Sequence, residues 1–152
     1  MKKFEFTGET KTISLFFRTA TLHRIRAVAE FGLVKIGDLG GWIEKEENLS
    51  HGGKAWVWGN AKVCGDAEVF SASHVLVIGA IGSRDDFTTF FRDKDNEITV
   101  KCGCFLGKID KFLEKVTQTH GDSKYALVYR AAVEAARLQI DLSGEAQKDA
   151  NE

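Results

Sequence analysis

The sequence predicts a mainly β protein with a small α+β cap, and three observations support this prediction. The chain of 152 residues contains no proline and 15 glycines, so glycine must make its corners. An aliphatic residue recurs every six residues in the middle of the chain, a period that fits neither an α-helix nor simple strand alternation. Strand-like patterns dominate the flanking segments, and helical spacing begins only near residue 109.

The central repeat starts at Gly53 and reads G-K-A-W-V-W, G-N-A-K-V-C, G-D-A-E-V-F, S-A-S-H-V-L and V-I-G-A-I-G. The aliphatic positions are Val57, Val63, Val69, Val75 and Ile81, and the small positions are Ala55, Ala61, Ala67, Ser73 and Gly79. This run resembles the hexapeptide repeat of left-handed parallel β-helices, in which three hexads close one triangular coil. Ile43 and Leu49 extend the phase upstream, with a two-residue insertion at His51-Gly52. We therefore expect a short left-handed β-helix over residues 37–82.

The remaining segments divide the chain further. Residues 1–36 read as a β-rich N-terminal segment. Residues 83–142 read as a ββαα cap domain, and the polar residues 143–152 read as a frayed tail. Within the cap we expect strands at 87–92 and 98–102, a hairpin connection at 93–97, a helix at 109–116, and a second helix from residues 121–123 onward.

Composition narrows the class of protein. With 43% hydrophobic and 28% charged residues, the chain is typical of a soluble globular protein. The net charge of -1 argues against a general nucleic-acid binder, which needs excess Lys and Arg. We find no apolar stretch long enough to span a membrane and no signal-peptide core, so we expect a cytoplasmic protein. Three cysteines, an odd number, argue against a disulfide framework and fit a reducing compartment.

A little over two coils cannot bury a core alone, because each coil contacts only its neighbours. The expected outward positions carry large apolar side chains: Trp56, Trp58, Phe70 and Leu76. We therefore predict that these residues form a subunit interface, with a homotrimer as its natural form. The alternative is that the flanking segments fold back over the same faces.

A second candidate site lies where the expected solenoid joins the cap. This polar region combines guanidinium, hydroxyl and other basic groups that suit a phosphate or another anion. The anion-binding candidates are Arg84, Thr88, Thr89, Arg92, Lys101 and His120. The alternative is an ordinary network of salt bridges between domains.

Catalytic and metal chemistry find weaker support. Cys102-Gly103-Cys104 with His120 lacks the fourth ligand of a structural zinc site, so we predict no metal there and expect the cysteines to pack as half-buried side chains. We also predict no cofactor and no catalytic residue. Many hexapeptide-repeat proteins are acyltransferases with a histidine base. An acyltransferase using His74 is therefore an alternative, although we find no acyl-CoA signature.

A broader resemblance covers nearly the whole chain. It is carried by L-H-R-I-R-A, G-D-L-G-G-W-I-E-K-E-E-N-L-S, the A-x-V hexads, S-R-D-D-F-T-T-F-F and C-G-C-F-L-G-K-I-D-K-F-L-E-K-V-T-Q-T-H-G-D-S-K-Y-A. These segments resemble a family of phage and prophage proteins labelled only as hexapeptide-repeat, transferase or polymer-forming proteins.

The resemblance implies a phage-encoded protein in the host cytoplasm. By analogy with small phage proteins of this size, we expect a non-enzymatic oligomer that acts in counter-defence by binding a host protein or a phosphorylated, nucleotide-like small molecule. A purely structural assembly module is the other alternative.

Overall fold

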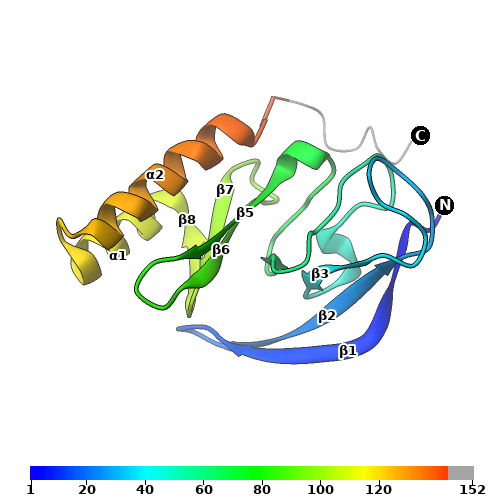
Figure 1. Ribbon diagram of the computed structural model, residues 1–152, viewed down its shortest axis with the longest axis horizontal. Coiled ribbons are helices and arrows are strands. Elements are labelled where there is room, and N and C mark those ends of the chain that lie inside the picture. Colours follow the sequence, from blue (N-terminus) through cyan, green and yellow to red (C-terminus); the bar gives the residue numbers. More distant parts are fainter. Residues whose placement is uncertain (144–152) are drawn as a thin grey trace.

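In the computed structural model, which describes residues 1–143, the chain folds as a mainly β α+β protein with two four-stranded sheets and two α-helices (Figure 1). The first sheet has the order β1-β2-β3-β4. Its strands are β1 (Phe4–Ser14), β2 (Thr19–Ala27), β3 (Leu39–Ile43) and β4 (Lys62–Val63). The first three strands are antiparallel neighbours, whereas β4 runs parallel to β3.

The second sheet is an antiparallel meander with the order β5-β6-β7-β8. Its strands are β5 (Val75–Ile81), β6 (Asp86–Arg92), β7 (Ile98–Cys102) and β8 (Phe105–Lys108), and the helices that follow are α1 (Ile109–His120) and α2 (Lys124–Gln139). Two short 3-10 helices, Glu46–Asn48 and Ala72–His74, lie in the loops before β4 and β5.

The second sheet is the middle layer of the molecule, with the helices on one side and the first sheet on the other (Figure 1). Successive side chains of a strand point to opposite faces, and β6 uses both. Phe90 packs in one core with Phe112 of α1, whereas Phe91 packs in the other core with Val63. Because both of its faces are covered, this sheet can place buried groups against the helices.

The prediction of a left-handed β-helix is wrong. Parallel pairing in this region is limited to the two residue pairs of β3 and β4 and to one isolated bridge, between Leu49 and Val69. After this bridge the chain does not close another coil. It enters β5, which pairs antiparallel with β6.

The repeat does mark the residues that face inward. Val57, Val63 and Val69 are fully buried. The buried side chain of Asn48 holds two passes of the chain together, since it accepts hydrogen bonds from the backbone of Glu44 and Lys45 and donates to Gly65 O and Ala67 O. A six-residue period therefore identifies the buried side of these loops, but the pairing around them differs from a solenoid.

The sheets also divide the chain differently from the expected ranges. β5 lies within the range expected for the solenoid, 37–82, yet it is the first strand of the second sheet. The expected boundary at residues 82 and 83 therefore falls in the turn of the β5–β6 hairpin. Of the expected tail at 143–152, residues 144–152 lie outside the described part of the chain.

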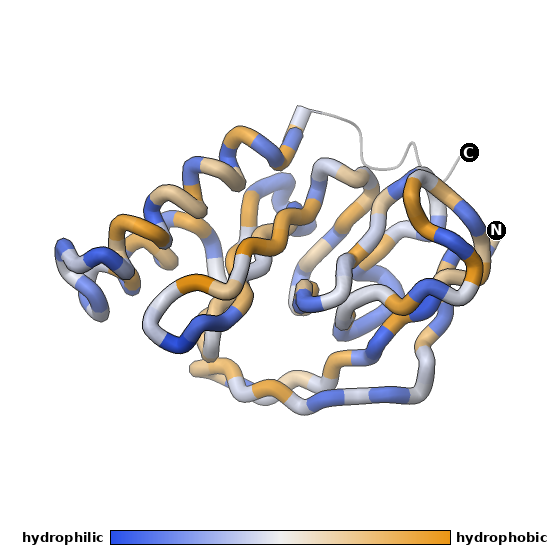
Figure 2. Tube along the Cα trace, in the orientation of Figure 1, coloured by the Kyte–Doolittle hydropathy of each residue, from blue (hydrophilic) through white to orange (hydrophobic). Residues whose placement is uncertain are grey.

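The C-terminal elements agree more closely with the sequence. β6 and β7 occupy the expected strands, and Ser123 is the N-cap of α2. The alternation of apolar and polar residues along α2 is visible in Figure 2, and Tyr129, Val133 and Ala136 form its buried face. Within residues 1–143, neither helix has the length and apolar character needed to cross a membrane.

Candidate functional site

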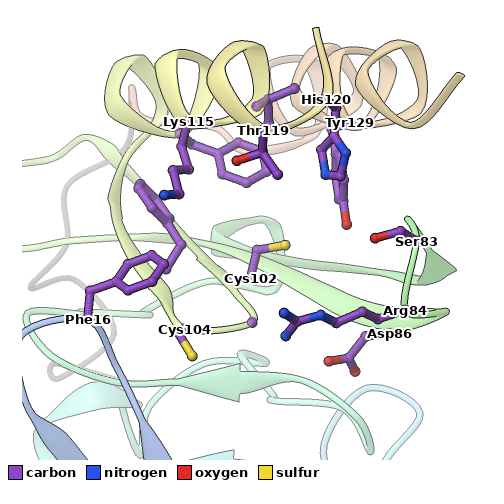
Figure 3. Close-up of a pocket in the computed structure, with 14 residues that line it drawn as sticks. Phe16, Ser83, Arg84, Asp86, Cys102, Cys104, Lys115, Thr119, His120 and Tyr129 are labelled. Atoms are coloured by element: carbon purple, nitrogen blue, oxygen red, sulfur yellow. The ribbon is translucent and has the colours of Figure 1, made fainter. Parts of the chain in front are cut away.

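A cavity of about 200 Å³ lies between the helices and the turns of the second sheet. Its upper wall comes from α1 and Tyr129 of α2, and its floor comes from the β5–β6 turn and the β7–β8 turn (Figure 3). Phe16, next to the end of β1, reaches its open side. The cavity is therefore built by segments that are far apart in the sequence.

The inner wall of the cavity is aromatic. The rings of Phe105 and Phe112 are 5.4 Å apart between centroids, and those of Phe112 and Tyr129 are 5.7 Å apart with perpendicular planes. The ring of His120 also stacks on Tyr129, with centroids 5.7 Å apart. Such rings offer a flat apolar surface, and their edges and faces favour another aromatic group in the same space.

Tyr129 is held tightly at this wall. Its side chain is 8% exposed, and burial, together with the neighbouring Cys102, raises its pKa to about 12. Its hydroxyl lies over Gly82, since a Cβ on that glycine would stand 1.9 Å from Tyr129 Oη. The phenol therefore keeps its proton at neutral pH and remains a hydrogen-bond donor.

Two cationic side chains border the cavity. Lys115 of α1 lies over the ring of Phe16, with its Nζ 4.8 Å from the ring centroid. Arg84 projects from the polar tip of the β5–β6 turn, and its Nη1 is 3.9 Å from the point that a Cβ on Gly103 would occupy (Figures 2 and 3). Asp86, the first residue of β6, is the one acidic group among residues 1–143 that lines the cavity.

The guanidinium of Arg84 differs from the other arginines, all of which lie within residues 1–143. Each of the others makes a hydrogen bond or ion pair with a protein group, such as Arg18 with Glu44 and Arg92 with Glu68. No such bond is formed by Arg84 within this range. Arg84 is also exposed, in the turn between β5 and β6.

Of the predicted anion site, the structure brings only Arg84 and His120 to this cavity. Thr88 is buried beneath its floor, where its hydroxyl donates to Cys102 Sγ at 3.4 Å. The other candidates lie elsewhere because the strands alternate. Thr89 and Lys101 pair across β6 and β7 on the face opposite the helices.

Those other candidates are already engaged. Thr89 Oγ1 accepts from Lys62 N at 3.0 Å, and Lys101 donates to Gly103 O. Burial lowers the pKa of Lys101. Arg92 donates to Asn96 Oδ1 at 2.9 Å and to Glu68 O at 3.0 Å. The predicted set of six residues does not form one site.

The residues predicted for a subunit interface are also dispersed. Trp56 is 2% exposed inside the core of the first sheet, so it cannot present a face to another chain. Leu76 packs against the core under the helices, and Phe70 is partly buried beneath the guanidinium of Arg92. Trp58 remains half exposed, at 50%.

His74, the base of the alternative acyltransferase, is 4% exposed. Its Nδ1 accepts a hydrogen bond from Phe70 N at 3.1 Å, and its pKa is lowered by burial and by Arg92. It lies apart from the residues that line the cavity. This arrangement gives it a structural hydrogen-bonding role.

Sequence reasoning missed Phe16, Lys115 and Tyr129 as site residues and treated Cys102 as packing. One signal was available, because α1 continues to His120 and not only to residue 116. The spacing of Phe112, Lys115, Val116, Thr119 and His120 then places all of them on one helix face toward the cavity.

Comparison with protein-family models gives no match, and comparison with curated proteins gives none either. The resemblance to phage and prophage proteins therefore stays a prediction. Within residues 1–143, no group of three or more His, Cys, Asp or Glu side chains is placed to hold a metal ion.

Proposed function

We propose that this protein binds a small organic anion in the cavity between the helices and the second sheet. The observation that carries the proposal is the guanidinium of Arg84, which borders the cavity and makes no hydrogen bond or ion pair with residues 1–143. Arg84 and Lys115 bring two positive charges against the single carboxylate of Asp86. An anion is the ligand that such a balance favours.

The size of the cavity limits the ligand. Pockets for drug-sized molecules span about 300–1,000 Å³, whereas this one measures about 200 Å³. The aromatic wall of Phe105, Phe112 and Tyr129 suits a flat ring. The ligand is therefore a single ring with a carboxylate or phosphate, or that end of a larger molecule whose remainder extends past Phe16.

The test is calorimetric titration with benzoate, phenyl phosphate and neutral benzyl alcohol. We expect either anion to bind more tightly than the alcohol, and the stronger of the two identifies the anionic group. Arg84→Gln should weaken anion binding about fivefold, the effect of one partly exposed charge–charge contact. It should leave the alcohol unchanged.

The matched control is Arg137→Gln, which removes the same charge from the outer face of α2, where Arg137 pairs with Glu134 at 2.9 Å. Equal binding of anions and the alcohol, or equal effects of the two arginine substitutions, would exclude the proposal. Thermal unfolding of both variants separates lost binding from lost structure.

The biological setting is the wider part of the proposal. In it the protein is a non-enzymatic, phage-encoded oligomer in the host cytoplasm that sequesters such an anion or binds a host protein. Native mass spectrometry tests this directly. An oligomer that retains an anionic adduct supports sequestration, whereas an oligomer without an adduct favours a protein partner.

A further inference from the structure

The three cysteines lie in different environments. Cys64 is fully buried, and burial followed by the nearby carboxylate of Glu44 raises its pKa to about 11, so it is an inert thiol. Cys102 and Cys104 are both partly exposed and flank the β7–β8 turn. In Figure 3, Cys102 Sγ points toward the helices and the aromatic wall, whereas Cys104 Sγ points away from them.

One buried hydroxyl lies against Cys102 Sγ. Thr88 Oγ1 donates a hydrogen bond to it at 3.4 Å. Thr88 is 1% exposed, so water competes little for this bond.

The cavity thus combines a thiol with groups that would bind an anion. Arg84 leans toward the same β7–β8 turn that carries Cys102. The phenol of Tyr129 lines the same cavity and keeps its proton. It can therefore donate a hydrogen bond to negative charge that passes from the sulfur to a ligand during a reaction. A ligand held through its anionic group by Arg84 would place its ring near Cys102.

We propose that Cys102 is a nucleophile that adds to a small α,β-unsaturated carbonyl compound carrying a carboxylate. The carboxylate part of this proposal rests on the proposed function, whereas the nucleophilic part does not. In the addition, a bond forms between Cys102 Sγ and the β-carbon, and the π electrons of the double bond move toward the carbonyl oxygen. The α-carbon then takes up a proton from water, which replaces the proton that the thiol lost to water. No group leaves and nothing is oxidised.

The experiment compares two single-ring electrophiles, N-ethylmaleimide and 3-maleimidopropionate, which share the reactive ring and differ in the carboxylate. Peptide mapping by mass spectrometry gives the labelling rate at each cysteine of the intact protein. We expect Cys102 to react first, Cys64 not to react before unfolding, and 3-maleimidopropionate to outpace N-ethylmaleimide at Cys102 after correction for their rates with free cysteine.

Two variants make the result specific. Arg84→Gln should lower the 3-maleimidopropionate rate at Cys102 about fivefold and change the N-ethylmaleimide rate less than about twofold. Cys102→Ser should abolish the fast labelling, and Cys104→Ser should leave it intact. Preferential labelling of Cys104, or a Cys102 no faster than free cysteine, would overturn the proposal.

Failure of this inference and failure of the proposed function are separable. Benzoate binding measured with Cys102→Ser reports the anion site without the thiol. Retained binding with an unreactive Cys102 excludes the nucleophile alone. Fast labelling of Cys102 by both maleimides, with no carboxylate preference and no benzoate binding, excludes the proposed function and with it the carboxylate requirement.

Discussion

Replacement of Gly82 by alanine should destabilise the protein through two separate effects. Gly82 has a φ of +82°, in the left-handed region that disfavours any residue with a Cβ. We expect this conformation to cost about 1 kcal/mol. The added Cβ would also lie 1.9 Å from Tyr129 Oη and 2.7 Å from Tyr129 Cζ, so the phenol must move. Overpacking of this kind costs about 2 kcal/mol more.

Gly8 provides a matched control for the first effect. Its φ is +96°, and a Cβ placed there would have no atom within 4 Å. Gly8→Ala should therefore lower stability by about 1 kcal/mol, against about 3 kcal/mol for Gly82→Ala. In thermal unfolding these values correspond to Tm decreases of about 2–4 °C and about 6–12 °C.

A double-mutant cycle with Tyr129→Phe isolates the contact itself. Removal of the hydroxyl eliminates the shortest approach and leaves the one to Cζ, so part of the loss in Gly82→Ala should be recovered. If Gly82→Ala and Gly8→Ala unfold at the same temperature, Tyr129 does not lie over Gly82. The phenol would then not form this wall of the cavity.

Two further predictions concern charged groups outside the cavity. The side chain of Asp93 is 1% exposed, and its burial alone would raise its pKa. Hydrogen bonds from Lys108, Thr99 and the backbone outweigh this effect, so the pKa of Asp93 is lowered. Lys108→Met should then lower the free energy of unfolding by about 2 kcal/mol at neutral pH. Urea unfolding should show this deficit shrinking as the pH falls below about 3.8, where the carboxyl of the unfolded chain takes up a proton. A deficit that does not depend on pH would refute the ion pair. The pKa of His74 is lowered by burial and by Arg92, and a hydrogen bond to the backbone of Asp141 partly offsets this shift. The stability of the protein should therefore fall as the pH drops from about 6.5, the pKa in the unfolded chain, toward the lower pKa in the folded protein. His74→Gln should flatten that slope, and an unchanged slope would show that another group titrates.

The central repeat shows what the sequence could and could not predict. Its aliphatic and small positions are buried through the first three hexads, where the period reports which side chains face inward, but Ser73 and Ile81 are partly exposed and Gly79 is exposed. Strand pairing depends on backbone partners that a side-chain pattern does not identify. β5 continues the same hexads, yet its partner is β6 across a hairpin, so the register that would have stacked a third coil is never formed.

The candidate site was only partly predictable for a related reason. Arg84 and His120 were recognised as cationic groups, but adjacent residues on β6 point to opposite faces, which separates Thr88 from Thr89. Tyr129 has the spacing of a core residue and is buried like one. Its hydroxyl enters the cavity because Gly82 leaves room for it, and a helical stripe in the sequence does not report such a contact.

The distribution of ion pairs strengthens the case for this cavity over the other predicted sites. The cationic candidates outside it, Arg92 and Lys101, each have protein partners and are nearly buried, so binding an anion there would require existing bonds to break. Anion binding at Arg84 would break no bond with any of residues 1–143. One small cavity is lined by the aromatic wall, the thiol of Cys102 and the guanidinium of Arg84, which has no partner among residues 1–143. A single anionic ring compound would use all three.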